Sequence, residues 1–381
     1  MDFDLRDEEK LIRDTARELA EKEFAPVAAR HDETSEFPRE NVRKLAELGF
    51  LGVCVEERWG GAGLSSLAYV LAMEEISRAC ASTGVIMSVQ NSLVCDPIQK
   101  FGNDAQKEKY LRPLAQGRMI GAYCLTEPEA GSDAQNLRTT AVREGDHYVV
   151  NGTKNFITNG QVADAYIVYC KTDPAAGHRG ISALIVDGTS EGLTRGHKEN
   201  TMGIRASSTC SLFFTNVRVP VENLLGQEGQ GFKVALATLD GGRIGIAAQA
   251  LGIAQAALDA ATKYSQERKT FGRPIAELQA IQWMLADSVT EVEASRLLTY
   301  RAAYKKDSGE RYSMEAAMAK LFASRTAVRV ADRAVQVHGG YGYVKEYAVE
   351  RFYRDAKITE LYEGTSEIQR MVIARNLLTP S

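Results

Sequence analysis

Cysteine and histidine are few and scattered in this sequence, with six cysteines and five histidines among 381 residues. No CxxC pair occurs, and metal sites usually draw their ligands from such short spacings. We therefore expect no metal site, and we expect the cysteines to be reduced thiols in the interior. Long apolar runs are also missing, since none approaches the roughly 18 residues of a membrane span. The N-terminal stretch MDFDLRDEEKLIRD is acidic and lacks the apolar centre of a signal peptide.

The common phosphate-binding motifs are absent as well. No GxGxxG follows a strand-like run, and no GxxxxGK precedes a Ser or Thr, so a Rossmann or P-loop protein is not expected. The net charge of −4 and the pI near 5.9 provide no basic excess, which a nucleic-acid-binding face usually needs. Because no basic leader is visible, the cytoplasm is the expected location, and a processed mitochondrial matrix protein is the alternative.

The sequence does contain the ordinary balance of a globular protein, with 44% hydrophobic and 25% charged residues. Apolar residues first recur at three- and four-residue steps, as in helices, then at a period of two, and finally at the helical period again. The middle part also has Asn151-Gly152 and Asn159-Gly160 as candidate hairpin turns. We predict an N-terminal helical domain, a middle antiparallel β-barrel or sandwich and a C-terminal helical bundle, with boundaries at 1–118, 119–227 and 228–381.

Three short segments contain residues that packing alone does not explain. Residues 123–133 run from a strand into a loop whose amides and hydroxyls could bind a polar ring or a pyrophosphate, although a capped turn is the simpler interpretation. Residues 336–342 end a helix, where glycines form either a C-cap or an opening for a bulky ligand. Residues 361–367 offer Thr365 or Ser366 as an N-cap for the last helix, but capping explains every residue there except Glu363.

Taken together, these segments strongly resemble the acyl-CoA dehydrogenase family, and the resemblance covers essentially the whole chain. The first segment resembles the flavin-binding signature of the family, and the stretch from Gln336 through Asp355 resembles its second signature. Tyr-Glu-Gly-Thr-Ser-Glu at 362–367 resembles its catalytic strip. The resemblance implies a C-terminal four-helix bundle, a homotetramer built as a dimer of dimers, and FAD bound between the β-domain and the bundle. It also implies an acyl-CoA substrate and electron-transfer flavoprotein as the electron acceptor.

The resemblance further implies a reaction. Glu363 would remove a proton from Cα of a saturated acyl-CoA while a hydride leaves Cβ for the flavin, and the product would be a trans-2-enoyl-CoA. The backbone N–H of Glu363 and a ribityl hydroxyl of FAD would stabilise the enolate. A dry pocket should raise the pKa of Glu363, and Arg243 should limit that rise. The expected substrate contacts are Ser132, Asp240, Arg243, Tyr362 and Gly364.

The contacts with FAD that the resemblance implies come from several parts of the chain. Those expected at the flavin are Tyr123, Leu125, Thr126, Gly131 and Ser132, and those expected to cover one edge of the ring are Phe156, Ile157 and Thr158. Those expected to hold the pyrophosphate and adenosine are Arg268, Phe271 and Gln279. Those expected from the neighbouring subunit are Gln336, Gly339 and Gly340, and those expected to close the site are Thr365 and Glu367.

Three positions bear on specificity. Phe156 stands where many relatives carry tryptophan, and it keeps an aromatic surface. Glu129 stands where many relatives have glycine, and it would be strained if the loop required a positive φ. Gly242 occupies the helical position where some branched- and long-chain relatives carry the base, which leaves position 363 as the only candidate. The run from Leu239 to Gln255 is most similar to short-chain, butyryl-type members.

Other functions remain open on the sequence alone. A branched- or medium-chain acyl-CoA dehydrogenase would share the same motifs. An acyl-CoA oxidase passes electrons to oxygen, and such oxidases are generally longer, with an extra C-terminal helical region. A non-catalytic helical assembly protein of the same fold is the most distant alternative, and the presence of Glu363, Arg243 and both flavin segments argues against it.

Overall fold

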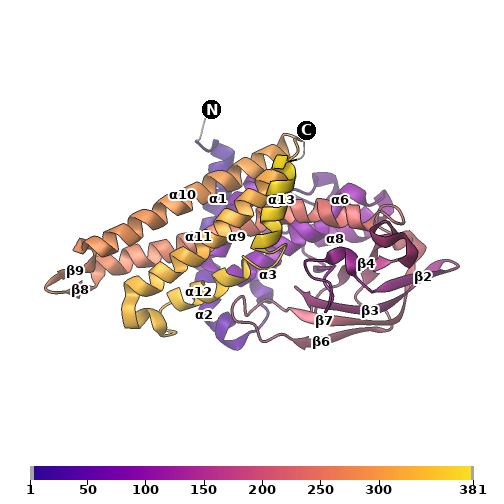
Figure 1. Ribbon diagram of the computed structural model, residues 1–381, viewed down its shortest axis with the longest axis horizontal. Helices are drawn as coiled ribbons and strands as arrows, with labels where there is room; N and C mark the ends of the chain where they lie inside the picture. Colours follow the sequence, from indigo (N-terminus) through magenta and orange to yellow (C-terminus); the bar gives the residue numbers. More distant parts are fainter. Residues whose placement is uncertain (1–3, 379–381) are drawn as a thin grey trace.

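Helices, a β-sheet and a second set of longer helices follow one another along the chain in the computed structural model, which describes residues 4–378. In Figure 1 the β-sheet lies at one end of the molecule, and the short hairpin of β8 (Lys269–Thr270) and β9 (Arg273–Pro274) lies at the opposite end, with the long helices between them. The predicted order of helical domain, β-domain and helical bundle is therefore confirmed.

The N-terminal helices pack against the C-terminal ones, and α4 makes the largest share of that contact with α9. The N-terminus of α4 is capped twice. The Ser65 hydroxyl accepts the N–H of Ala68 at 3.1 Å, and the carboxylate of Asp307, from the bundle, accepts the N–H of Ser66 at 2.7 Å. This cap ties the two helical regions together. The helices are α1 (Asp7–Leu19), α2 (Ala25–Thr34), α3 (Arg39–Glu47), α4 (Ser66–Ala79), α5 (Ala81–Ser88), α6 (Asp96–Phe101), α7 (Asp104–Gln106) and α8 (Arg112–Ala115).

The middle region forms a seven-stranded sheet of order β1-β4-β2-β3-β7-β6, with β5 paired to β4, and it encloses a core of its own. Most pairs are antiparallel, as predicted, but β1 runs parallel to β4. The chain makes the hairpin of β2 and β3 between these two strands and returns beside β1 in the same direction. The strands are β1 (Gly121–Cys124), β2 (Thr140–Glu144), β3 (His147–Ile157), β4 (Ala165–Lys171), β5 (Ile181–Asp187), β6 (Leu193–Lys198) and β7 (Cys210–Pro220).

The two Asn-Gly dipeptides do not form the predicted hairpins. Asn151 and Gly152 lie inside β3, at a shift in its register with β7. A Cβ on Gly152 would lie 2.4 Å from the hydroxyl oxygen of Thr139, so this glycine permits close packing at an irregularity in the sheet. Asn159 and Gly160 do form a turn after β3, and Asn159 has a φ of 63°. That turn leads to β4, which does not pair with β3.

The C-terminal helices are built around α9, which packs against α4, α10, α11 and α12. Within residues 4–378, α9 is the one helix long and apolar enough to cross a membrane, but 83% of its apolar window is buried inside the protein. That burial is what a central core helix shows. The loop that joins α12 to α13 reaches the middle of α9, and this junction positions the site described below. The helices are α9 (Gly231–Glu267), α10 (Gln279–Asp307), α11 (Ser313–His338), α12 (Val349–Ile358) and α13 (Ser366–Leu378).

Candidate active site

Glu363 lies in the loop between α12 and α13, with its backbone in the left-handed region. Its φ is 51°, and that of Gly364 is 91°. For a glutamate this conformation costs on the order of 1–3 kcal/mol. The amide of Gln369 donates to the carbonyl oxygens of Glu363 and Gly364 at 3.2 and 2.8 Å, and the ammonium of Lys320 donates to that of Gly364 at 2.7 Å. Two buried side chains therefore hold the strained turn in place.

Glu363 is half-buried, and one oxygen of its carboxylate is enclosed by the protein. Its Oε2 atom is buried and accepts no hydrogen bond from any residue between 4 and 378. Burial raises the pKa of Glu363 to about 7, although the positive charges of Lys320 and Arg243 oppose the rise. A carboxylate with a free oxygen and a near-neutral pKa is suited to taking up a proton at physiological pH.

Gly242 on α9 leaves the space that this carboxylate occupies. A Cβ built on Gly242 would lie 2.0 Å from Oε2 of Glu363 and 2.8 Å from Cδ2 of Leu93. No side chain fits there while Glu363 keeps its position. The space beside α9 at this position is therefore occupied by a carboxylate that comes from another segment of the chain.

Arg243 and Tyr362 are both fixed beside this carboxylate. Arg243 is 5% exposed, and its Nη1 donates to Asp240 at 2.6 Å, while Asp240 also accepts the hydroxyl of Ser313. The Nε of Arg243 has no partner within residues 4–378, so one charged donor is free. The hydroxyl of Tyr362 donates to the side-chain oxygen of Gln249 on α9. Of the predicted substrate contacts, Asp240, Arg243, Tyr362 and Gly364 thus lie around Glu363.

The loop after β1 is anchored by a buried ion pair. The ammonium of Lys154, which is fully buried, lies 2.8 Å from the carboxylate of Glu127 and donates to the carbonyl oxygen of Leu125 at 3.1 Å. A buried charge of this kind is tolerated when it is paired and hydrogen-bonded. The carbonyl oxygen of Thr126 accepts the N–H of Asn155 at 2.9 Å. These bonds fix Leu125 and Thr126, two predicted flavin contacts, against the end of β3.

The other predicted flavin contacts of this region lie around the same edge. Phe156 is 63% exposed with a φ of 54°, whereas the neighbouring Ile157 is buried. Gly131 and Ser132 lie in an exposed loop, and no atom comes within 4 Å of a Cβ built on Gly131. An exposed aromatic ring beside an open, polar loop is a surface that a flat ring can cover, so these residues fit a flavin. Tyr123 and Thr158 are half-buried at the same edge.

Glu129 is not strained in this loop. It is not among the residues with a positive φ, and its exposed carboxylate lies 2.5 Å from the guanidinium of Arg138. An exposed pair of this kind contributes about 0–1 kcal/mol. The substitution of glycine by glutamate is therefore compatible with the loop geometry, and the concern raised by the sequence does not apply.

A second group of predicted FAD contacts lies at the far end of the bundle. Arg268 follows α9, Phe271 lies between β8 and β9, and Gln279 begins α10, so all three lie remote from the β-sheet (Figure 1). Phe271 is 90% exposed with a φ of 49°. Arg268 is exposed as well, and its guanidinium lies 5.4 Å from the centre of the Tyr341 ring.

The residues expected from a neighbouring subunit lie in that same place. Gly339 and Gly340 line one hollow with Arg268, and no atom lies within 4 Å of a Cβ built on either glycine. Gln336 is exposed one turn earlier on α11. Arg268, Phe271 and Gln279 therefore lie at the same end of the bundle as the residues expected from a neighbouring subunit. The C-terminal ends of α9 and α11 thus line one hollow, at the end of the molecule opposite the β-sheet (Figure 1).

The N-terminus of α13 closes the catalytic strip. The hydroxyl of Thr365 accepts the N–H of Ile368 at 3.4 Å, so Thr365 is the N-cap that the sequence proposed as one of two candidates. Glu367 stands in the first turn with its side chain 77% exposed, where a carboxylate is favoured by the helix dipole. Both residues remain available to a ligand outside the strip.

Three functional residues were missed from the sequence. Lys320, Gln369 and Lys154 are all fully buried and all donate to backbone carbonyl oxygens of the loops described above. The sequence could have identified Lys320 as a buried residue, because it lies at helical spacing between Ala316 and Ala323 on the buried face of α11. A lone lysine on an apolar helical face is almost always paired inside the fold.

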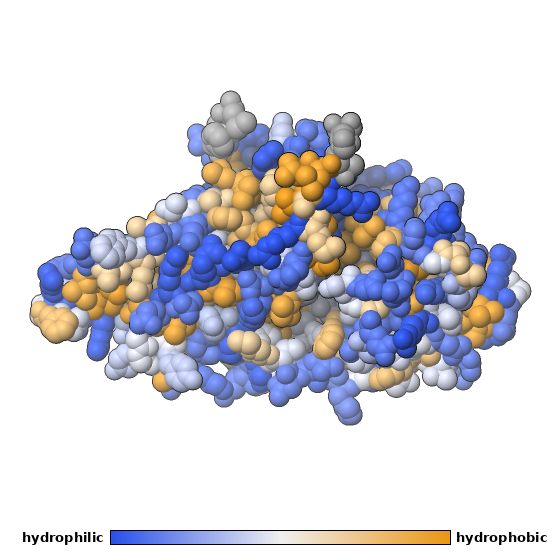
Figure 2. Space-filling view, in the orientation of Figure 1, coloured by the Kyte–Doolittle hydropathy of each residue, from blue (hydrophilic) through white to orange (hydrophobic). Residues whose placement is uncertain are grey.

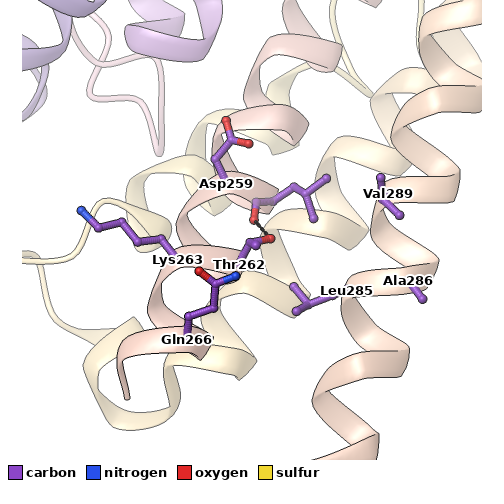
Figure 3. Close-up of a pocket in the computed structure, with 8 residues that line it drawn as sticks. Asp259, Thr262, Lys263, Gln266, Leu285, Ala286 and Val289 are labelled. Atoms are coloured by element: carbon purple, nitrogen blue, oxygen red, sulfur yellow. Dashed lines mark hydrogen bonds between the residues drawn. The ribbon is translucent and has the colours of Figure 1, made fainter. Parts of the chain in front are cut away.

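The hollow in Figure 3 is a separate feature. It lies between α9 and α10 and is lined by Leu258 and four polar side chains of α9 and by apolar side chains of α10, including Leu285 and Val289. Its nearest residue on α9 is sixteen positions beyond Gly242, which corresponds to roughly 24 Å along the helix. No predicted site residue lines it.

Comparison with known proteins shows which family this chain is similar to. Family models for the N-terminal, middle and C-terminal domains of acyl-CoA dehydrogenase match residues 6–118, 122–217 and 229–378. A short-chain specific acyl-CoA dehydrogenase of Clostridium acetobutylicum is 52% identical over 374 residues, which cover 98% of this chain and 99% of that protein. The solved butyryl-CoA dehydrogenase of Megasphaera elsdenii is 47% identical with a TM-score of 0.98. A chain in the structure of the electron transferring flavoprotein of Acidaminococcus fermentans is 50% identical with a TM-score of 0.99, and both structural alignments cover 100% of each chain.

Proposed function

The chain belongs to the acyl-CoA dehydrogenase family of FAD-dependent oxidoreductases, and we propose that Glu363 is its catalytic base in the conversion of a short-chain acyl-CoA to the trans-2-enoyl-CoA. The observation that carries this proposal is the enclosed Oε2 of Glu363, which has no hydrogen-bond partner within residues 4–378 and belongs to a group with a pKa of about 7. A short-chain substrate is supported by the similarity to a short-chain specific relative and to a butyryl-CoA dehydrogenase.

The base acts on the α-carbon of the thioester. Glu363 removes the proton as a carboxylate, and its buried position lets that carboxylate hold the proton near neutral pH. Gly242 leaves the room for the side chain. Arg243, with its free Nε and its bond to Asp240, orients the carboxylate and limits the rise in its pKa.

The same residue offers a donor for the negative charge that develops on the thioester oxygen. The backbone N–H of Glu363 makes no hydrogen bond within residues 4–378. A fixed N–H aimed at a developing oxyanion stabilises the transition state more than the ground state. The left-handed turn at Glu363 and Gly364 therefore supplies the base and the oxyanion donor from one position.

The residues around the edge of the β-domain fit FAD, since they combine an exposed aromatic ring with an open loop. We assign Tyr123, Thr126, Phe156 and Thr158 to the flavin. FAD supplies a two-electron acceptor for the hydride that leaves Cβ. We propose electron-transfer flavoprotein as the next acceptor, supported by the matching chain in the Acidaminococcus fermentans structure.

The substrate and the acceptor are tested together. Purified protein should be yellow and should oxidise butyryl-CoA faster than palmitoyl-CoA or branched acyl-CoAs, with a dye or electron-transfer flavoprotein as acceptor. Stoichiometric hydrogen peroxide in air would instead identify an oxidase. A preference for a longer or branched chain would contradict the short-chain assignment, and a colourless protein that takes up no FAD would favour a non-catalytic role.

The rate should depend on pH through Glu363. The reaction needs the carboxylate form, and burial raises the pKa of this group to about 7. Therefore kcat/KM should rise with pH until about 7 and then level off. Initial rates with butyryl-CoA from acid to neutral pH measure this rise, which is the acidic limb of the pH profile. An acidic limb with an apparent pKa near the ordinary glutamate value of about 4.3 would contradict the enclosed position of the base.

Removal of Arg243 should weaken turnover without removing the cofactor. In Arg243→Ala we expect kcat/KM to fall roughly 10- to 100-fold, as for the loss of one charged hydrogen bond. The acidic limb should also move to higher pH, because Arg243 lowers the pKa of Glu363. Arg311→Ala, an exposed arginine between α10 and α11, is the matched control and should behave as wild type. An unchanged limb in Arg243→Ala would show that this charge does not act on the base.

We further propose that each FAD site is completed by a second copy of the chain, within a homotetramer built as a dimer of dimers. The support is that Arg268 lies between α9 and β8, and that β8 lies at the end of the molecule opposite the β-sheet (Figure 1). Large apolar side chains are also exposed on α13 (Figure 2), including Met371 at 66% and Leu377 at 73%. Patches of this kind mark association surfaces.

Mixing two inactive variants tests the shared site. Glu363→Gln loses the base, and Arg268→Ala loses a contact with FAD. In a hybrid of the two chains, one site combines both defects and the other has neither. Co-expression should therefore restore activity that each variant lacks alone. No recovery in a purified hybrid would mean that each chain holds its FAD by itself. Homo-oligomers that contain only one of the two variants serve as the controls.

We propose the cytoplasm as the location, with the mitochondrial matrix as the alternative, since the relatives include a protein of Clostridium acetobutylicum at 52% identity and a mitochondrial protein of Mus musculus at 54%. Cell fractionation with activity measurements tests this assignment.

A further inference from the structure

Lys320 is a completely buried cation in the middle of α11. Its side chain has no exposure to solvent, and within residues 4–378 no carboxylate oxygen lies within 4 Å of its ammonium group. The single hydrogen bond that it makes in this part of the chain is to the carbonyl oxygen of Gly364, at 2.7 Å. Lysine is almost never fully buried unless it is paired. Packing therefore does not explain this residue.

The hydrogen bond that Lys320 donates is accepted by a residue of the strained turn. Glu363 and Gly364 have φ values of 51° and 91°, and the carbonyl oxygen of Gly364 accepts the hydrogen bond from Lys320 on α11. Gln369 supplies the second donor to the same carbonyl oxygen, at 2.8 Å. The amide of Gln369 is neutral, so Lys320 is the only charged group that holds the turn within residues 4–378.

The charge of Lys320 also acts on the carboxylate of Glu363. Burial lowers the pKa of Lys320 to about 8, and Glu363 is the strongest influence in the opposite direction. Arg243 also lowers the pKa of this ammonium group, while Glu360 and Glu367 raise it. On the other side, burial raises the pKa of Glu363, and Lys320 and Arg243 oppose that rise, with Lys320 the stronger of the two.

Three tyrosine hydroxyls also face this carboxylate. Tyr69, Tyr123 and Tyr362 each have a pKa raised first by burial and further by the charge of Glu363. They stay neutral through the range in which Glu363 titrates. The charged groups that face Glu363 are therefore Lys320 and Arg243.

We propose that Lys320 is a positioning residue for the base: its ammonium group fixes the left-handed turn that carries Glu363 and places a positive charge beside the carboxylate. Arg243 approaches from α9, whereas Lys320 contacts the loop of Glu363 and Gly364 from α11. The charge of Lys320 favours the carboxylate form of Glu363 and opposes the effect of burial. This inference rests on the proposed role of Glu363.

Lys320→Met tests the inference, because methionine keeps much of the volume but removes the charge and the donor. The variant should retain FAD. The acidic limb of the kcat/KM profile should move to higher pH. At pH values below the limb, kcat/KM should fall about tenfold for each pH unit of that shift. Lys320→Arg restores a positive charge and should bring the limb back toward its wild-type position. Lys233→Met, an exposed lysine on α9, is the matched control and should not change the profile.

Two results would overturn the inference. A Lys320→Met enzyme whose limb stays at the wild-type pH would show that this charge does not act on the base. A Lys320→Arg limb that moves as far as that of Lys320→Met would assign the effect to packing. If Lys320→Met does not fold, Lys320→Gln takes its place, since it keeps a donor without the charge. A Glu363→Gln variant that still removes α-hydrogens would refute the proposed function itself, whereas an inactive Glu363→Gln beside an unshifted Lys320→Met would refute only the role of Lys320.

Discussion

Replacement of Glu363 by glutamine should lower kcat by roughly 10²–10⁴-fold, the usual contribution of a general base. Glutamine has nearly the same shape, and the bonds that hold the turn go to the backbone carbonyls of residues 363 and 364. The turn should therefore survive the substitution. The protein should keep its yellow colour and its affinity for acyl-CoA, while the bleaching of the flavin by substrate should be lost.

The matched control for this substitution is Glu310→Gln. Glu310 follows α10 with its side chain 55% exposed, and it lies 3.6 Å from Lys305. An exposed pair of this kind contributes little, so the control should bleach at the wild-type rate. Stopped-flow absorbance under anaerobic conditions measures both variants. Bleaching of Glu363→Gln at a rate close to wild type would mean that another group removes the proton.

Replacement of Gly242 by alanine should be nearly as damaging, although it removes no functional group. The new Cβ would lie 2.0 Å from Oε2 of Glu363 and 2.8 Å from Cδ2 of Leu93, so the carboxylate would have to move. A displacement of about 1 Å can cost about 10²-fold in rate. We expect a loss of that size or greater in kcat, with FAD retained.

Gly241→Ala provides a control on the same helix. A Cβ on Gly241 would lie 3.5 Å from the ammonium nitrogen of Lys306 and 4.0 Å from the nearest atoms of Asp96 and Tyr312, which are ordinary contacts. Alanine is favoured over glycine inside a helix by about 1 kcal/mol, so this variant should melt at a slightly higher temperature and keep its activity. Wild-type turnover in Gly242→Ala would show that the carboxylate does not occupy the position described.

The role of Glu363 as base came from the family resemblance and not from the local pattern. Capping accounts for Thr365 and for the acidic first turn of α13, and it leaves Glu363 as a residue without a local purpose. Its buried Oε2 atom, which has no hydrogen-bond partner within residues 4–378, is compatible with the implied role. Gly242 was first interpreted as the absence of a base on α9. Its contact distance shows that it also makes room for the base from the other segment.

Other features could not be predicted because they depend on distant parts of the chain. Asn151-Gly152 has the composition of a hairpin turn, but contact with Thr139 decides that it lies inside β3. Lys320 stands in a regular helical pattern, and only the fold brings its ammonium group to Gly364. The separation of Arg268 from the β-domain follows from the length of α9, which spans Gly231 to Glu267. Sequence motifs do not record how far apart two contacts of one cofactor lie.

The removal of the α-proton can be measured apart from the redox step. An acyl-CoA with sulfur in place of Cβ has no hydride to lose, so any reaction in deuterated water is limited to exchange of its α-hydrogens. Mass spectrometry of the recovered thioester should show exchange with the wild-type protein and exchange at least about 10²-fold slower with Glu363→Gln. Exchange at equal rates in the two proteins would contradict the assignment of Glu363 as the base.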